Sequence, residues 1–323
     1  MSKENDKKIP VIIDCDPGHD DAMAILWALS SPRIELRAVT TVAGNQTIEK
    51  VTTNAIKVLT KAHRTDIPVA MGAKAPLIRK LVVGGEVVHG DSGLEGPVLP
   101  ECGFDPSKLT ALEMLVKTIE ESEEKITLIP IGPLTNIATL FIVRPDLKEK
   151  IERISLMGGG AYMGNWTPAA EYNIWADPEA AKVVFNSGLP IIMSGLDVTH
   201  KAYITREENE ILRAQGNEIS IFAAELIDYF SRYHYEVEGF PGCTMHDPTA
   251  VAVLLYPEMF TSVKCNVDVE ITGELTTGMT VVDTIGYKKK IFGENPDENT
   301  TVLFNVDRKK YVEAFFAAMK SLG

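Results

Sequence analysis

Short apolar runs alternate with stretches of helical spacing along much of the chain. The apolar runs are rich in β-branched residues and predict strands at 9–14, 36–42, 67–71, 126–131, 154–157 and 189–193. Apolar residues three or four apart predict helices at 20–30, 47–63, 106–121, 134–141 and 178–187. Strands that alternate with helices predict an α/β fold with a mostly parallel central sheet. Nearly continuous apolar strands indicate helices on both faces of that sheet, as in an open Rossmann-like arrangement.

Two segments interrupt this alternation. Residues 76–106 are rich in glycine and proline, and a loop of this length is uncommon unless it is functional or mobile. Residues 205–246 have the pattern of one or two helices, so we expect a helical excursion that caps an edge of the sheet. No internal repeat, low-complexity tract or linker is evident, and we expect one domain over residues 1–323.

Composition and charge narrow the classes of function. The formal net charge is −13, which argues against nucleic acid or an anionic membrane surface as the main partner, since both require a basic face. The first ten residues contain no apolar core of a secretory signal, and no apolar run approaches a membrane span. We therefore expect a cytoplasmic protein, whose four cysteines, none of them in a CxxC pair, are reduced.

Four aspartates lie within eight residues directly after the first predicted strand: Asp14, Asp16, Asp20 and Asp21. Unpaired carboxylates this close together would repel one another and would pay for desolvation. No lysine or arginine is near them in sequence, so a hard cation with oxygen ligands is the expected partner. Helix capping would explain one of these aspartates but not four. The EF-hand pattern fails at its glycine and glutamate positions, and Pro17 and Gly18 do not fit an aspartyl-phosphate phosphatase.

Glycine and polar residues also follow the other predicted strands, at 43–45, 131–136, 158–160 and 195–197. Ligands of open parallel sheets bind at the carboxyl ends of the strands, so these turns together predict a site. Asp177 and Pro178 have the pattern of a helix start, with the aspartate as the cap. Asp247 before Pro248 fits the same device, but a metal ligand can also lie at a helix start.

At this point the sequence resembles the inosine/uridine-preferring nucleoside hydrolases. The most specific motif is Asp14-Cys15-Asp16-Pro17-Gly18-His19-Asp20-Asp21, and further matches follow in order along nearly the whole chain, at 41–45, 134–136, 157–160, 171–173, 177–181, 195–199 and 246–248. The resemblance implies hydrolysis of the N-glycosidic bond of ribonucleosides to free base and ribose, with a calcium ion in the pocket. It also implies a homo-oligomer, either dimer or tetramer.

The resemblance further implies a role for particular residues. Asp16 would be the general base that activates water. The calcium ligands would be the carboxylates of Asp16, Asp20, Asp21 and Asp247 and the backbone carbonyl of Ile131, with Asp14 supporting them from behind. The ribose hydroxyls would contact Asn45, Asn165, Glu171 and Asn173, with Met157 against the sugar.

For the residues around the base, the sequence leaves alternatives open. His246 is expected as the acid that protonates the leaving base, because histidine titrates near neutral pH, although a buried histidine bonded to a carbonyl is the alternative. His89 would line the mouth of the pocket or be a solvated loop residue. Tyr172 would stack on the base, whereas Tyr229 and Tyr233, on a predicted helix, are more typical of a core.

The base preference is expected to be broad or to include pyrimidines. The purine-preferring branch of the family packs the base between tryptophans and has no histidine acid, whereas Trp27, Trp166 and Trp175 lie in elements that look structural. Two rival classes stay open. A non-catalytic protein that holds a ribose-like sugar through calcium would need the same ligands, and a metal-dependent phosphohydrolase would need a phosphate cradle that is not evident here.

Overall fold

The computed structural model describes residues 8–323 and contains an eight-stranded sheet. Seven of these strands run parallel, and β9, at one edge, is antiparallel to β12. In spatial order the strands are β3 (Val69–Met71), β2 (Ile34–Thr41), β1 (Ile9–Cys15), β4 (Ile126–Pro130), β5 (Ile151–Met157), β6 (Ile191–Ser194), β12 (Thr300–Val306) and β9 (Phe260–Cys265). The predicted α/β class and mostly parallel sheet are confirmed.

Two strands of this sheet, β9 and β12, were not predicted from the sequence. Most residues of β9 are exposed, as suits an edge strand, so its apolar pattern is weak. β12 pairs with β6, which lies more than a hundred residues earlier, and this partner is not evident from local periodicity.

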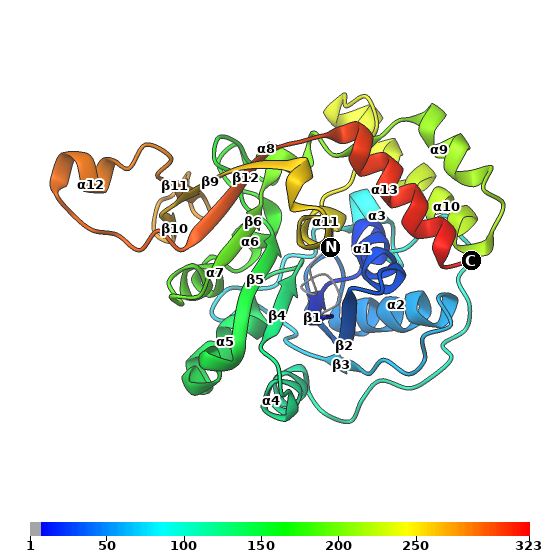
Figure 1. Cartoon of the computed structure of the whole chain (residues 1–323), viewed down its shortest axis with the longest axis horizontal. Coiled ribbons are helices and arrows are strands. Elements are labelled where there is room, and N and C mark those ends of the chain that lie inside the picture. The colour runs from blue at the N-terminus through cyan, green and yellow to red at the C-terminus, as the bar shows by residue number, and fades with distance from the viewer. Residues whose placement is uncertain (1–7) are drawn as a thin grey trace, which may run out of the picture.

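Helices cover both faces of the sheet (Figure 1). One face carries α1 (His19–Ser30), α2 (Ile48–Lys61), α11 (Pro248–Leu255) and α13 (Arg308–Ser321). The opposite face carries α4 (Ala111–Glu121), α5 (Thr135–Val143) and α7 (Pro178–Phe185). Each set packs its apolar side chains into its own buried core against the sheet, which is why the strands are apolar on both faces.

The expected helical excursion is present beyond β6. It contains α9 (Arg206–Arg213) and α10 (Glu218–Tyr233), and α10 continues into a π-turn, η3 (His234–Glu238). Gly239, with φ of 68°, ends that turn in the left-handed region that glycine tolerates best. A two-stranded ribbon, β7 (Tyr203–Ile204) with β8 (Cys243–Thr244), brings the chain back toward the sheet.

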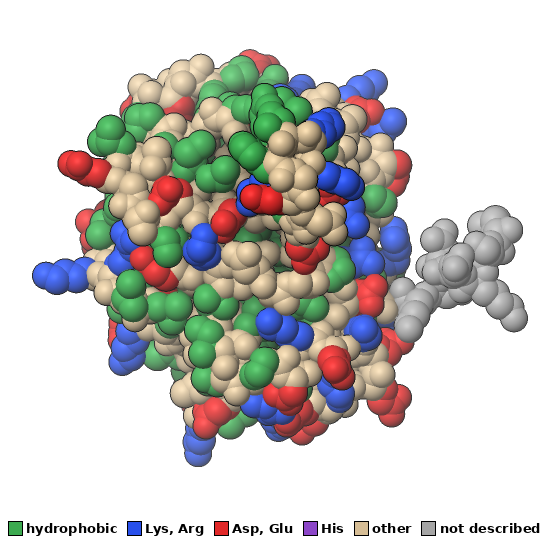
Figure 2. Space-filling model, turned by 90° about the vertical axis from the view of Figure 1, so that its left-hand side faces the viewer, with side chains coloured by type: hydrophobic (Ala, Val, Ile, Leu, Met, Phe, Trp, Pro, Cys, Tyr) green, Lys and Arg blue, Asp and Glu red, His purple; other side chains and the backbone are tan. Residues whose placement is uncertain are grey.

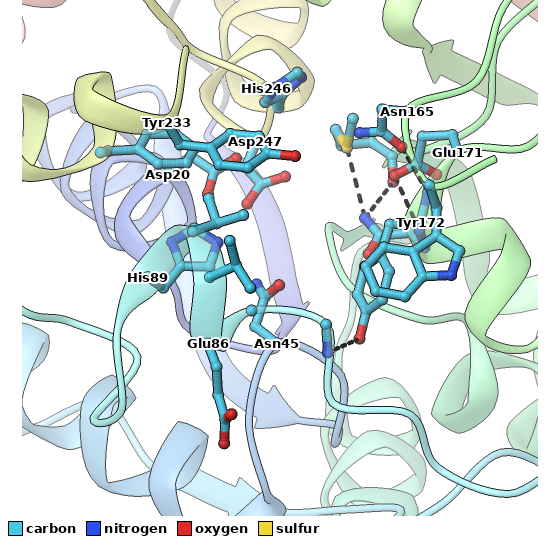
Figure 3. Close-up of a pocket in the computed structure, with 18 of the residues that line it drawn as sticks. Asp20, Asn45, Glu86, His89, Asn165, Glu171, Tyr172, Tyr233, His246 and Asp247 are labelled. Atoms are coloured by element: carbon cyan, nitrogen blue, oxygen red, sulfur yellow. Dashed lines mark hydrogen bonds between the residues drawn. The ribbon is translucent and has the colours of Figure 1, made fainter. Parts of the chain in front are cut away.

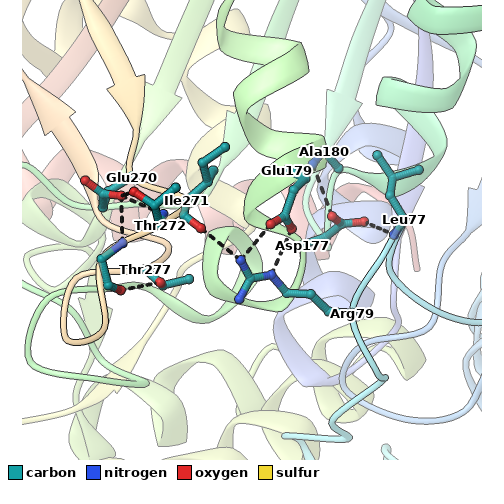
Figure 4. A network of polar contacts seen from close by, with 10 residues as sticks. Leu77, Arg79, Asp177, Glu179, Ala180, Glu270, Ile271, Thr272 and Thr277 are labelled. Carbon is teal, nitrogen blue, oxygen red and sulfur yellow. Dashed lines mark hydrogen bonds and ion pairs between the residues drawn. The ribbon is translucent and has the colours of Figure 1, made fainter.

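The long glycine- and proline-rich segment holds only one short helix, α3 (Glu86–His89). Its start is fixed to α7 (Figure 4). The guanidinium of Arg79 donates to both carboxylate oxygens of Glu179, at 2.8 and 2.6 Å, and the Leu77 N–H donates to Asp177 at 2.8 Å. Asp177 also accepts from the Ala180 N–H at 3.1 Å, which confirms its predicted role as a helix cap.

A small arm projects from the β9 edge of the molecule (Figure 1). It consists of the ribbon β10 (Val267–Val269) with β11 (Thr280–Val282) and the short helix α12 (Tyr287–Phe292). Large apolar side chains of the arm are exposed, among them Ile291 and Phe292. Seen from this side, the surface carries groups of hydrophobic side chains among acidic and basic ones (Figure 2).

The remaining elements are short: η2 (Pro145–Lys150), α6 (Tyr172–Ala176), α8 (Leu196–Thr199) and η4 (Pro257–Met259). No described helix is long and apolar enough to cross a membrane. All four cysteines are unpaired. The prediction that the chain start lacks a secretory signal concerns mostly residues 1–7, which lie outside the described part.

Candidate active site

The carboxyl ends of β1, β2, β4 and β5 meet at one edge of the sheet, beside a cavity of about 320 Å³. Figure 3 shows His89, His246 and Asp247 on one side of this cavity and Asn165, Glu171 and Tyr172 on the other. The structure thus brings most of the predicted site residues to one wall or another: Asp20, Asn45, His89, Ile131, Met157, Asn165, Glu171, Tyr172, Asn173, His246 and Asp247. Asp14, Asp16 and Asp21 lie behind the lining.

Three buried carboxylates form a compact group at the floor. Asp20, Asp21 and Asp247 each offer an oxygen within 4.8 Å of the others. Burial raises the pKa of Asp20 and of Asp247, and repulsion between the carboxylates raises both further. Asp247 begins α11 but makes no side-chain capping bond there, so its carboxylate is free to face the other two. The sequence left open whether Asp247 is a helix cap or a metal ligand.

Asp16 lies beside this group but is not a member of it. One carboxylate oxygen, Oδ2, accepts the Asn45 N–H at 2.7 Å, whereas the buried Oδ1 has no hydrogen-bond partner. A Cβ atom would lie 2.2 Å from Oδ2 if built on Gly44 and 2.4 Å from Oδ1 if built on Gly132. The glycines that follow β2 and β4 therefore make room for the carboxylate of Asp16.

Asp21 also organises the turn that carries the cluster. Its Oδ1 accepts the Asp16 N–H at 3.1 Å and its Oδ2 accepts the Gly18 N–H at 2.9 Å. These two bonds use donors at the start of α1, where a negative charge is favoured. The pKa of Asp21 is nevertheless raised to about 6, because desolvation outweighs them.

Asp14 supports the strand ends from below. It accepts hydrogen bonds from the Thr40 hydroxyl at 2.5 Å and from the Asn136 amide at 2.8 Å, while its other oxygen has no partner. Asn136 also donates to the Thr41 carbonyl. Asp14 thus joins the ends of β1, β2 and the start of α5, and desolvation raises its pKa to about 7.

On the opposite wall, Glu171 and Asn173 are fixed by the backbone. Glu171 accepts N–H groups of Gly159, Asn173 and Ile174 at 2.8, 2.9 and 3.2 Å. Burial still raises its pKa to about 7. The Asn173 amide donates to the Ile131 carbonyl at 2.9 Å, which leaves that carbonyl one lone pair for another donor or an ion.

His246 is held by two threonine hydroxyls. Its Nε2 lies 2.8 Å from Thr244 and its Nδ1 lies 2.8 Å from Thr199. His234 Nδ1 lies 3.1 Å from the Phe230 carbonyl, which can only accept, so the proton of neutral His234 is on Nδ1 and its Nε2 accepts from Thr244. Thr244 must then accept from His246 Nε2–H. Neither ring nitrogen of His246 is free to face the cavity in this conformation.

His89 is buried and lines the cavity, so it is not a solvated loop residue. His19 Nε2 is 2.8 Å from the Glu95 carbonyl and must donate to it, which makes Nδ1 of neutral His19 an acceptor. The Nδ1 atom of His89 accepts the His19 backbone N–H at 3.3 Å and also lies 2.9 Å from His19 Nδ1, so His19 holds the ring of His89 on this wall.

Several residues that line the cavity were not predicted as site residues from the sequence. Tyr233 and Phe230, on α10, line the cavity, whereas Tyr229 stacks on His19. An aromatic residue on a helix is more often part of the hydrophobic core. Only the position of the helical excursion shows that this face of α10 covers a cavity. Trp166 also lines the cavity and is 39% exposed, so it is not merely structural; Trp27 is buried against Tyr311. Glu238 also lines the cavity, and no sequence pattern predicted it as a site residue.

The donor set fits a hard divalent cation. All side-chain donors at the floor are carboxylate oxygens, one buried oxygen of Asp16 lacks a partner, and no lysine or arginine among residues 8–323 forms an ion pair with Asp16, Asp20, Asp21 or Asp247. Such a group of buried carboxylates calls for positive charge, and oxygen ligands are those that calcium and magnesium prefer.

Comparison with known proteins agrees with this geometry. Residues 11–313 match the family described as inosine-uridine preferring nucleoside hydrolase. The chain is 50% identical to the pyrimidine-specific ribonucleoside hydrolase RihA of Escherichia coli K12, over 97% of this chain and 98% of that one. It is similar to a purine-preferring ribonucleoside hydrolase from Gardnerella vaginalis (TM-score 0.89, 30% identity, 97% and 98% of the two chains). A plant nucleoside hydrolase, PpNRh1, gives a TM-score of 0.87 at 31% identity, over 97% of this chain and 99% of that one.

Proposed function

Because the chain belongs to the inosine-uridine preferring nucleoside hydrolase family, we propose that it hydrolyses pyrimidine ribonucleosides to base and ribose with the help of calcium. One observation carries this proposal: Asp20 and Asp247, grouped with the buried carboxylate of Asp21 behind them, form the floor of a cavity whose walls carry amides and carboxyls suited to ribose hydroxyls.

Calcium would be held by Asp20, Asp21 and Asp247, with Asp16 and the Ile131 carbonyl as further oxygen ligands. When bound, the ion lowers the pKa of a coordinated water and attracts the ribose hydroxyls. The mutual repulsion of the floor carboxylates supports this assignment, because a cation would relieve it.

Asp16 would take the proton of the attacking water. Its Oδ1 atom has no hydrogen-bond partner and is the available acceptor, while Oδ2 is fixed by the Asn45 N–H. Burial raises the pKa of Asp16, and repulsion from Asp21 raises it further, which makes the carboxylate a stronger base as long as a cation keeps it ionised. A single attack by water implies inversion at C1′.

The ribose would lie against Asn45, Asn165, Glu171 and Asn173, with Met157 beneath it. Cleavage at C1′ builds positive charge on the sugar ring, as in other glycosyl transfers. The carboxylates around the floor stabilise that charge electrostatically, and they are buried, so water screens them little.

His246 must change its hydrogen bonding before it can act as the acid. Burial lowers its pKa well below the usual value, so the ring is neutral near pH 7, and its one N–H is directed at Thr244. For His246 to protonate a leaving base, its ring must first release Thr244. Nitrophenyl riboside tests the role, because its leaving group needs no proton: loss of His246 should impair uridine cleavage far more.

The preference for pyrimidines rests on the 50% identity with RihA, which exceeds the 30% identity with the purine-preferring structure. The rival phosphohydrolase predicts activity on nitrophenyl phosphate. The rival calcium-dependent binding protein predicts calcium uptake with no turnover of nitrophenyl riboside.

We also propose a cytoplasmic homo-oligomer with a role in nucleoside salvage. The exposed apolar side chains of the arm, including Ile291 and Phe292, are the surface that supports self-association. Light scattering coupled to gel filtration measures the assembly, and a monomer would contradict it.

The decisive experiment follows release of base and ribose from uridine, cytidine, inosine and 2′-deoxyuridine, with calcium or with a chelator. We expect cleavage of the pyrimidine ribosides, little cleavage of the deoxy substrate, and loss of activity on chelation. Release of base only in the presence of phosphate would identify a phosphorylase and would contradict the role of Asp16.

A further inference from the structure

Glu238 carries a buried acceptor that the fold leaves without a partner. It is the last residue of η3 and lines the same cavity as the floor carboxylates, with its side chain 19% exposed. Its Oε2 atom is buried and accepts no hydrogen bond. A buried acceptor without a partner costs free energy, so a ligand that brings a donor to it gains more than it would in water.

His234 cannot supply the missing donor. Its Nε2 atom is 3.8 Å from Glu238 Oε2, beyond hydrogen-bonding distance, and that nitrogen already accepts the Thr244 hydroxyl in the neutral ring. Burial lowers the pKa of His234 to about 3, so the ring is neutral at working pH. Desolvation alone raises the pKa of Glu238 to about 7, and no described lysine or arginine pairs with it.

Two parts of the cavity lining differ in character. The floor carries the carboxylates from α1 and the start of α11, and the polar wall beside it carries Asn173 and Glu171. The wall contributed by the excursion holds Phe230, Tyr233 and Glu238. Sugar hydroxyls belong at the polar floor, so an attached base extends toward the aromatic wall, where its flat faces can pack on rings and its polar edge meets a carboxyl.

We propose that Glu238 is a specificity-determining residue that accepts a hydrogen bond from an N–H on the edge of the base. This assignment rests on the proposed function and deepens it, because it names the group that reads the base. The carboxyl keeps an acceptor oxygen whether or not it is protonated. Uracil offers its ring N3–H and cytosine offers its exocyclic amine, so both pyrimidines satisfy the acceptor. A leaving group without an N–H, such as nitrophenol, does not.

The test compares uridine, cytidine and nitrophenyl riboside with the calcium-loaded enzyme. Glu238→Met keeps an unbranched side chain but removes the acceptor, and Glu238→Gln keeps an acceptor oxygen. We expect Glu238→Met to lower kcat/KM for both nucleosides about ten- to a hundredfold, the usual scale for a lost bond to a buried polar group. The loss for nitrophenyl riboside should be at least tenfold smaller, and Glu238→Gln should recover most of the nucleoside activity. Glu236→Met, an exposed neighbour in the same turn, is the matched control and should change nothing.

Two results would overturn the assignment. An equal loss for all three substrates would show that Glu238 only supports the fold of η3, and an unchanged kcat/KM would show that it does not contact the base. If the unmodified enzyme cleaved none of the substrates, the proposed function itself would be wrong, and the assignment would fall with it. Activity on nitrophenyl riboside in the unmodified enzyme separates this case from the first two.

Discussion

Thr244 stands between two buried histidines: its hydroxyl is hydrogen-bonded to Nε2 of His234 and lies 2.8 Å from Nε2 of His246. It donates to the first ring and accepts from the second. One small side chain on the β7–β8 ribbon therefore fixes the protonated nitrogen of the histidine next to Asp247.

Replacing Thr244 by valine should destabilise the protein, because two buried ring nitrogens lose their partner at once. We expect the free energy of unfolding to fall by about 2 to 4 kcal/mol. Urea denaturation measures this, and Thr244→Ser, which keeps the hydroxyl, should lose much less. Equal losses in both variants would mean that packing of the methyl group, and not the hydrogen bonds, matters at this position.

Replacing Asp247 by asparagine should have opposite effects on stability with and without calcium. In a chelator, the variant should melt at a higher temperature than the parent, because one of three mutually repelling buried carboxylates is gone. Calcium at a thousandfold excess over Kd should raise the free energy of unfolding of the parent by about 4 kcal/mol, and the variant should lose most of that increase.

Thermal melts in both buffers measure these shifts. Asp197→Asn is the matched control, because Asp197 is also buried at the sheet edge but bonds to the Ala161 N–H outside the carboxylate group. Its calcium-induced shift should equal that of the parent. A full shift in Asp247→Asn would refute the predicted ligand role of Asp247.

Glu171 should make stability fall as the pH rises from about 4.5 to 7. Its folded pKa is raised to about 7 from the ordinary 4.5, so in this window the folded state keeps a proton that the unfolded state has released. Stability therefore falls by on the order of 3 kcal/mol across the window, because only the unfolded state gains free energy by releasing the proton. Glu171→Gln removes this pH dependence of stability.

The difference in unfolding free energy between Glu171→Gln and the parent should thus move in favour of the variant as the pH rises through the window. Urea titrations at several pH values in a chelator measure it. Glu179→Gln is the control and should show a nearly flat difference in this window, because Arg79 lowers the pKa of Glu179 below the ordinary 4.5 and its carboxylate is ionised in both states above that pH. A flat difference for Glu171 would mean that its backbone donors offset its burial.

Replacing Arg79 by methionine should loosen the segment that leads to α3. The ion pair with Glu179 is partly exposed, so the loss of global stability should stay within about 1 kcal/mol. Residues 84–89 line the cavity, however, and we expect KM to rise several-fold with little change in kcat. Hydrogen exchange over residues 77–90 measures the loosening. Arg79→Lys, which keeps the charge but not the bidentate bond, should lie in between. Unchanged exchange would show that other contacts hold this segment.

Much of the fold was predictable, because the α/β pattern is local. Apolar β-branched runs mark β1, β2, β4 and β5, and the spacing of the helices between them predicts a parallel sheet. The role of the aspartates at 14–21 was also predictable, because four carboxylates at a strand end need a positively charged partner in any fold. The edge strand β9 was not predicted, because an exposed strand carries little apolar periodicity, and β12 was not, because its partner β6 lies more than a hundred residues earlier.

Local patterns were enough to place a cluster of aspartates at the carboxyl edge of a parallel sheet, because periodicity and charge act over a few residues. Other features follow from the folded chain alone: Asp247 joins Asp20 and Asp21, threonines hold His246, and Tyr233 and Glu238 face the cavity. These contacts join segments far apart in the chain. Their geometry depends on how the excursion packs over the sheet, and no local pattern encodes that packing.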